Sequence, residues 1–394
     1  MAFLSGSLSF ERFHVVSPEV RTFGPEHLER LAERVAGETR PTADDPIRSG
    51  FLGGDHLFDR TFDFEKNVLI DALHFGIRID THKIPAAILR AWTQMELHAL
   101  MAENPGRRPT KAQREAAKEA VEQRAKVESE GGKYVRSNHY PVLWDAPSEM
   151  VYFGGSRGAA ADEFVLLMTA AFGMQFDRAG AGYLATRWAQ ANQAEALLDE
   201  IRPAVFHPEH TGGEAGWANA DSPHPDFLGN EFLLWLWHAV DQESDTFALA
   251  DGTEVAVMFA RSLALECPAG LSGRESLSFE NPTRLPEAME AIRTGKLPRK
   301  AGLTLVRLGQ QYELTLQAES LAISGAKLAK DPDAEGRAVL ESRIDAIRQL
   351  NETLDRLYER FLQVRISTNW GEQLEKISRW ASPLHPERRR NAAA

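Results

Sequence analysis

A long stripe of apolar residues in the last quarter of the chain restricts its fold most. Between residues 333 and 364, eight apolar side chains recur every three or four positions, which is the spacing of one face of an α-helix. They are Leu340, Ile344, Ile347, Leu350, Leu354, Leu357, Phe361 and Val364. Such a helix has to bury that face. The sequence leaves open whether the face covers the core of its own domain or the surface of a second copy of the chain.

The remaining sequence predicts strands and helices in irregular succession. Alternating apolar residues favour a strand over 68–80, and two runs joined near Gly309 favour a hairpin over 303–316. We therefore predict an α+β fold of antiparallel or mixed sheets with flanking helices. The predicted regions are an N-terminal α+β region at 1–201 with a basic helix at 107–128, an irregular insertion or linker at 202–225, a C-terminal α+β region at 226–382 with the hairpin and the helix 333–364, and a basic tail at 383–394.

Composition limits the class of protein. The 394 residues are 43% hydrophobic and 26% charged, which is typical of globular domains and excludes a mainly disordered chain. Cys267 is the single cysteine, so the chain forms no intrachain disulfide. The first ten residues lack the pattern of a signal peptide. The longest apolar stretch, 227–240, is too short and too polar to span a membrane. We expect a cytoplasmic protein.

Net charge argues against a protein that coats nucleic acid by bulk attraction, because 57 acidic residues outnumber 45 basic ones. Basic segments nevertheless occur. Residues 107–126 carry seven basic side chains and three acidic ones. A cationic helix of this kind can follow a phosphate backbone. The alternative is a solvated helix with internal pairs such as Glu115 with Lys118 and Glu122 with Lys126.

A second basic segment lies at residues 293–300. It contains Arg293, Lys296, Arg299 and Lys300, with no acidic residue between them, and its glycine and proline favour an irregular backbone. Cations without partners resist burial, so these side chains are expected to contact solvent or a bound anion. An ordinary basic loop is the alternative.

Catalytic signatures are weak. His207, Glu209 and His210, with His224 downstream, offer a zinc-like ligand set, but in a proline-rich segment that equally fits an exposed loop. Residues 154–158 (GGSRG) precede a helix and fit either a phosphate-binding turn or a simple turn. A nucleophile elbow, a P-loop and a dinucleotide fingerprint are not found. We expect no catalytic site, no metal and no cofactor.

Several blocks together resemble the recombination-associated RdgC family. The blocks are IRIDTHKIP at 77–85, the charged helix at 107–126, Leu143-Trp144, a helix ending at Phe172-Gly173, GNEFLLWLW at 229–237, GKLP at 295–298, LTL at 303–305, YELTL at 312–316 and SGAKL at 324–328. The likeness extends in patches over residues 8–365. This chain is longer than the compact members. Relative to them, 202–225 and the Phe227 block look like extra material, and the latter resembles a block of longer bacterial members.

The resemblance implies a DNA-binding protein rather than an enzyme. Members form a ring-shaped homodimer around double-stranded DNA, with little sequence preference, and limit RecA-type filaments on the nucleoid. Basic positions on the matching blocks are the implied DNA contacts: Arg78, Lys83, Arg114, Lys118, Arg124, Lys296, Arg299 and Lys300. An acidic exterior with a basic interior would reconcile the net charge with this role.

Two other functions stay open at this stage. A metal-dependent DNA exonuclease, a label once attached to the family, would depend on carboxylates or on His207 and His210. A protein-interaction scaffold would use the long helix and the apolar block at 227–240 and would not retain DNA.

Overall fold

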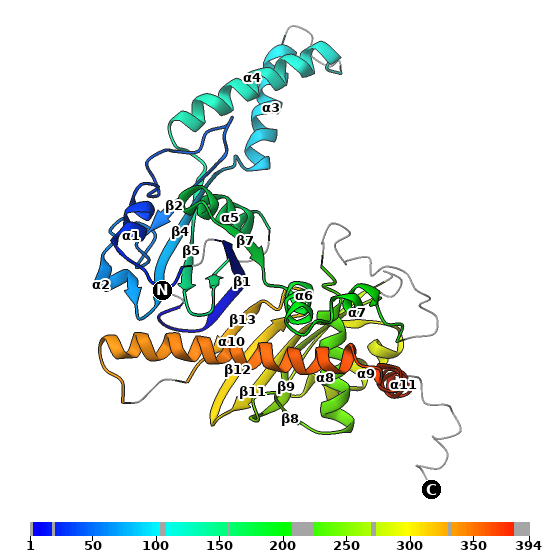
Figure 1. The fold of residues 1–394 in the computed structure, drawn as a ribbon. Coiled ribbons are helices and arrows are strands. Elements are labelled where there is room, and N and C mark those ends of the chain that lie inside the picture. Colours follow the sequence, from blue (N-terminus) through cyan, green and yellow to red (C-terminus); the bar gives the residue numbers. More distant parts are fainter. Residues whose placement is uncertain are drawn as a thin grey trace. The chain divides into compact units, whose positions relative to one another are not determined.

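The computed structural model describes residues 3–17, 20–102, 108–155, 158–206, 224–268, 273–329 and 333–381. The chain divides into two compact units, both drawn in Figure 1. Unit 1 comprises residues 20–144 and 157–175, and unit 2 comprises 2–19, 145–156 and 176–394. The units thus interleave along the chain, whereas the sequence predicted two regions in succession, separated by 202–225. Of that predicted insertion, 207–223 lie outside the described residues, as do the tail residues 383–394.

Unit 1 is a small sheet with helices around it. Strand β4 lies between β5 and β2, and β3 pairs with β4. The elements are α1 (Pro25–Ala32), β2 (Ile47–Leu52), α2 (Phe64–Asn67), β3 (Val68–Leu69), β4 (Ala72–His82), α3 (Ala86–Leu100), α4 (Lys111–Glu130), β5 (Val135–Asp145) and α5 (Ala159–Phe172). Helices α3 and α4 pack against each other and project from the strands (Figure 1).

The predicted single strand over 68–80 is wrong in one respect, because the chain turns within it. Ile70 adopts a φ of 54°, and the turn at Ile70-Asp71 folds β3 back onto β4, with Leu69 opposite Ala72. Asp71, which interrupted the apolar alternation, is exposed in this turn. Asp71, the polar residue that interrupted the alternation, therefore marks the turn of a hairpin.

Aromatic side chains form the core of unit 1. Trp144 makes edge-on contacts with Phe23 and Phe172, each with ring centroids 5.2 Å apart, and Phe51 contacts Phe75 at 5.6 Å. These residues come from β2, β4, β5, α5 and the segment before α1. Their burial fixes β2 and β4 in place, and both strands carry basic residues toward the surface.

Unit 2 contains a larger antiparallel sheet in the order β10-β9-β11-β12-β13-β1-β6, with β8 paired to β9 and β7 to β1. Its strands are β1 (Leu8–Ser17), β6 (Met150–Phe153), β7 (Gln175–Arg178), β8 (Thr246–Ala248), β9 (Glu254–Glu266), β10 (Arg274–Phe279), β11 (Leu297–Arg307), β12 (Gln310–Gln317) and β13 (Ile323–Lys327). The predicted hairpin is confirmed, since β11 and β12 pair from Lys300–Gln317 to Arg307–Gln310. The α+β class with a large antiparallel sheet and flanking helices is also confirmed.

The helices of unit 2 include the long one predicted from the apolar stripe. They are α6 (Ala181–Ala191), α7 (Glu195–Glu200), α8 (Leu228–Gln242), α9 (Pro286–Arg293), α10 (Arg337–Arg365) and α11 (Trp370–Ala381), with a 3₁₀ turn, η1 (Pro282–Arg284). Six of the eight stripe residues are buried, and Phe361 lies 5.7 Å from Phe232 of α8 between ring centroids. The stripe of α10 therefore covers the core of its own unit.

Helix α8 is buried almost all round, because α10, α11 and β11 all contact it. Its Glu231 pairs inside this core with Arg365 of α10 at 2.5 Å. Burial raises the pKa of Glu231, while Arg365 opposes that rise. In the part of the chain that the structure describes, no helix is both long and apolar enough to cross a membrane.

Candidate nucleic-acid interface

The basic segment 293–300 does not leave its cations free. Arg299 pairs with Glu266 at 3.1 Å and with the buried Glu319 at 2.5 Å, and Lys296 is buried 3.3 Å from Glu275. The expectation of cations without acidic partners is therefore wrong for this segment. The partners come from β9, β10 and the segment after β12, and residues 297–300 begin β11 rather than an irregular loop.

Lys300 is the exception in this segment. It is exposed on β11, and within the described chain its ammonium has no carboxylate partner. Arg293, by contrast, lies 3.8 Å from Glu290 one turn earlier on α9. One of the three implied DNA contacts in unit 2 is thus available to a ligand, and the other two hold the sheet together.

Helix α4 is less basic than the segment that predicted it. The helix begins at Lys111 and ends at Glu130, and it contains five basic and five acidic residues. Arg107 lies outside the described residues. Lys111 pairs with Glu115 and Lys118 with Glu122, at 3.9 and 3.6 Å. These i,i+4 pairs are the kind that the solvated-helix alternative expects, although their partners differ from those anticipated. Arg114 and Lys118 remain exposed.

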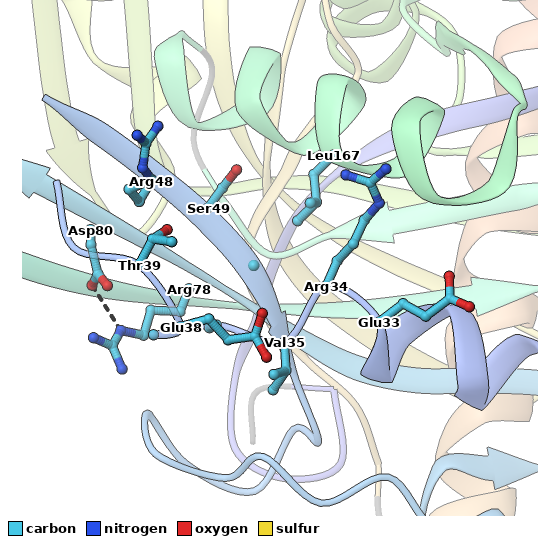
Figure 2. Close-up of a pocket in the computed structure, with 13 residues that line it drawn as sticks. Glu33, Arg34, Val35, Glu38, Thr39, Arg48, Ser49, Arg78, Asp80 and Leu167 are labelled. Atoms are coloured by element: carbon cyan, nitrogen blue, oxygen red, sulfur yellow. Dashed lines mark hydrogen bonds and ion pairs between the residues drawn. The ribbon is translucent and has the colours of Figure 1, made fainter. Parts of the chain in front are cut away.

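Arg78 and Arg124 have partners inside unit 1. Arg78 on β4 donates from Nε to Asp80 Oδ1 at 2.7 Å, and its guanidinium lies 5.9 Å from the Phe58 ring (Figure 2 draws the first contact). Arg124 of α4 stacks over Trp92 of α3 at 4.6 Å, which fastens the α3–α4 pair. Stacking leaves part of a guanidinium edge free to donate, but both side chains are held in place.

Three exposed cations gather where the strands of unit 1 end, and we call Arg40, Lys83 and Arg136 the strand-end cluster. Lys83 follows β4, Arg136 lies at the start of β5, and Arg40 lies in the loop before β2. All three are exposed. Among the described residues none of the three has a carboxylate partner. They therefore present positive charge directly to solvent.

Backbone hydrogen bonds bring these segments together. The Lys83 N–H donates to Tyr134 O at 3.2 Å, and the His82 N–H donates to Pro46 O at 2.8 Å. Thr81 Oγ1 donates to Arg136 O at 3.4 Å. The Arg40 guanidinium lies over the turn at Gly132, where a Cβ would come within 3.2 Å of Nη1. Loop, strand end and strand start thus meet at one end of the sheet.

The acidic residues beside the cluster are mostly engaged by other cations. Asp44 pairs with Lys126 of α4 at 3.2 Å, Asp45 with Arg48, and Glu128 with Lys133. Glu130, at the end of α4, is the exposed acidic neighbour without such a pair in the described chain. The cluster accordingly keeps an excess of positive charge inside an acidic protein.

Sequence reasoning found Lys83 but missed Arg40 and Arg136. Each of these two is a single basic residue with no local pattern, and their proximity depends on how the strands pair. No sequence signal of charge density could have found them. The pairing of the chain after β4 with the start of β5 places Arg136 beside Lys83, and the position of the loop over Gly132 brings Arg40 there.

The other predicted candidates contribute little. His207, Glu209 and His210 lie outside the described residues, while His224 contacts Thr186 Oγ1 at 3.2 Å. Of the GGSRG segment, Ser156 and Arg157 are not described, and Gly158 precedes α5. In the described ranges, no group of three or more His, Cys, Asp or Glu residues is placed to hold a metal ion.

Comparison with known proteins gives no relative: no family model matches the chain, and no curated protein sequence matches it.

Proposed function

We propose that the protein binds double-stranded DNA through backbone phosphates, without reading base sequence. The observation that carries the proposal is the strand-end cluster, in which three exposed cations from separate segments gather without carboxylate partners. Lys and Arg that are free in this way release condensed counterions from DNA when they contact phosphate. Arg114 and Lys300, which are exposed and have no carboxylate partner in the described chain, add further contacts of the same kind. Lys118 adds one when it exchanges Glu122 for a phosphate.

The resemblance to RdgC proteins adds the remaining parts of the proposal. On that basis the protein acts as a ring-shaped homodimer on the nucleoid and limits RecA-type recombination. In unit 2 the apolar face of α10 is already covered, so the interface between copies has to use another surface. Comparing linear with closed-circular duplex tests the ring, because a closed ring loads on a free end and slides off it.

A salt titration tests DNA binding itself. If about six phosphates are neutralised, the logarithm of affinity falls with the logarithm of salt concentration at a slope near −5. The variant Arg40→Gln, Lys83→Gln, Arg136→Gln removes three of these contacts, so its slope should be shallower by about 2 to 3. Affinity should fall about equally for unrelated sequences, because phosphate contacts carry no base information.

The matched control removes three exposed cations elsewhere. Arg360→Gln, Lys376→Gln, Arg379→Gln changes the net charge equally, on α10 and α11. Its salt slope should equal that of the wild type. If both variants lose affinity equally, the binding follows net charge and the cluster is not the site. If the wild type shows a flat slope, or cuts DNA when magnesium or manganese is added, the proposal is replaced by the scaffold or by the nuclease.

A further inference from the structure

A half-open polar hollow of about 240 Å³ lies beside β2 in unit 1, and one of its lining residues, Thr39, directly precedes Arg40 of the strand-end cluster. Residues 34–36 run along β2, with Val35 bridged in parallel to Phe51, and the chain leaves the strand at Gly37 with a φ of 84°. Gly50 permits this close approach, because a Cβ there would lie 2.6 Å from Ala36 Cα. The hollow opens where the two segments separate.

Hydrogen-bond donors surround the hollow. Figure 2 shows Arg34 beside Leu167 on one side and Arg48 with Thr39 on the other, with Ser49 between the two arginines. The Ser49 hydroxyl already donates to Glu163 Oε2 at 3.2 Å. The Arg34 guanidinium is exposed and has no partner among the described residues. In the same described chain, the peptide N–H groups of residues 37–39 donate to no other backbone group. The Arg34 guanidinium, the Thr39 hydroxyl and these N–H groups are donors of the kind that hold an anion.

Two of the three carboxylates that line the hollow have cationic partners. Asp80 is buried and accepts from Arg78, and Glu38 lies 3.9 Å from Arg60. Glu33 is exposed at the end of α1. Arg48 is fixed by its ion pair with Asp45. Arg34 therefore supplies the positive charge that a ligand would neutralise, while Arg48 and Arg78 shape the walls.

We infer that this hollow binds the terminal phosphate of a DNA end. A terminal phosphate carries about −1.5 to −2 charges and three free acceptor oxygens, which suit donors on several sides of a concave site. An internal phosphodiester has nucleotides on both sides, which hinder its entry into a hollow. The inference rests on the proposed function, since the strand-end cluster would hold the adjoining backbone.

The experiment compares two short blunt duplexes that differ only in a 5′-phosphate or a 5′-hydroxyl, with binding measured by fluorescence anisotropy. The wild type should bind the phosphorylated duplex on the order of tenfold more tightly, as expected for a few charge-assisted hydrogen bonds. Arg34→Gln should bind both duplexes equally, at the affinity of the wild type for the hydroxyl duplex. Arg34 is exposed, so the variant should fold normally, which circular dichroism checks.

Arg90→Gln is the matched control, because Arg90 is an exposed arginine of α3 away from the hollow. It should keep the preference for the phosphorylated duplex. Equal affinity of the wild type for both duplexes overturns the inference and leaves the proposed function standing. A preference that survives in Arg34→Gln also overturns it. Failure to bind either duplex overturns the inference and the proposed function together.

Discussion

Residues 293–300 and the strand-end cluster carry similar charge and use it differently. In the first, Lys296 and Arg299 meet carboxylates from neighbouring strands and are largely removed from solvent. In the second, Arg40, Lys83 and Arg136 come from separate segments, and the carboxylates beside them mostly have other partners. The comparison teaches that the availability of a cation depends on which acids the fold brings to it. Density of charge along the chain is a poor guide to that.

The largest expected effect lies in the paired region. Arg299→Leu leaves Glu319 in the core without its cation, although Asn230 and Gln317 still donate to that carboxylate. Removing one partner of a buried ion pair costs about 3 to 5 kcal/mol, so we expect a loss near the lower end of that range in urea unfolding. DNA affinity of the folded protein should not change.

A second substitution sharpens this prediction. Adding Glu319→Gln to Arg299→Leu removes the uncompensated charge and should restore part of the stability. If Arg299→Leu is as stable as the wild type but loses DNA affinity, the distinction between the paired segment 293–300 and the strand-end cluster is wrong. Arg299 would then act as a DNA contact, as the strand-end cluster is proposed to do.

Lowering the pH should destabilise the protein through the buried His74, whereas the exposed strand-end cluster should not respond to pH. Burial lowers the pKa of His74 on β4 to about 3, below the ordinary value of 6.5. His74 is therefore neutral in the folded state, while the unfolded chain binds a proton below pH 6.5. Stability is retained above that pH and is lost as the pH falls toward 3, by about 2 kcal/mol between pH 7 and pH 5 from this group.

Unfolding free energies measured at several pH values, for the wild type and for His74→Gln, isolate this contribution. The variant should show a shallower loss of stability across pH 7 to 5. The strand-end triple variant should keep the steep profile of the wild type, since lysine and arginine do not titrate there. Identical profiles for wild type and His74→Gln would show that His74 is not held neutral.

Lys300 lies in the paired segment 293–300 but is exposed, as the strand-end cluster residues are. Its substitution tests whether exposure alone makes a cation a DNA contact. Lys300→Gln should change the unfolding free energy by less than about 0.5 kcal/mol, as for most surface substitutions. It should reduce the salt slope of DNA binding by about one. An unchanged slope would confine DNA contact to unit 1.

The smallest effect is expected on α4. A double-mutant cycle on Lys118 and Glu122 should give a coupling of about 0.3 to 0.5 kcal/mol, which is typical of exposed i,i+4 pairs. A coupling of zero would mean that Lys118 is as free as the cluster residues. Lys118 would then count fully as a DNA contact.

Elements whose buried residues recur at regular local spacing could be predicted from the sequence. The stripe from Leu340 to Val364 predicted α10, and the runs on either side of Gly309 predicted the β11–β12 hairpin. In both cases neighbouring residues in the chain share one apolar face, so the periodicity carries the information. The same reasoning missed the turn at Ile70-Asp71, because two short strands in a hairpin can alternate like one long strand.

Which charged side chains lack a partner depends instead on contacts between residues far apart in the chain. Arg299 finds Glu266 from 33 residues away, while Arg40 and Arg136 reach Lys83 through strand pairing and a loop. Electrostatic pairing acts over a few ångströms of space whatever the distance along the chain. A lysine or arginine in the sequence therefore shows that a positive charge is present. The fold determines whether that charge pairs with a carboxylate of the protein or remains available to a phosphate.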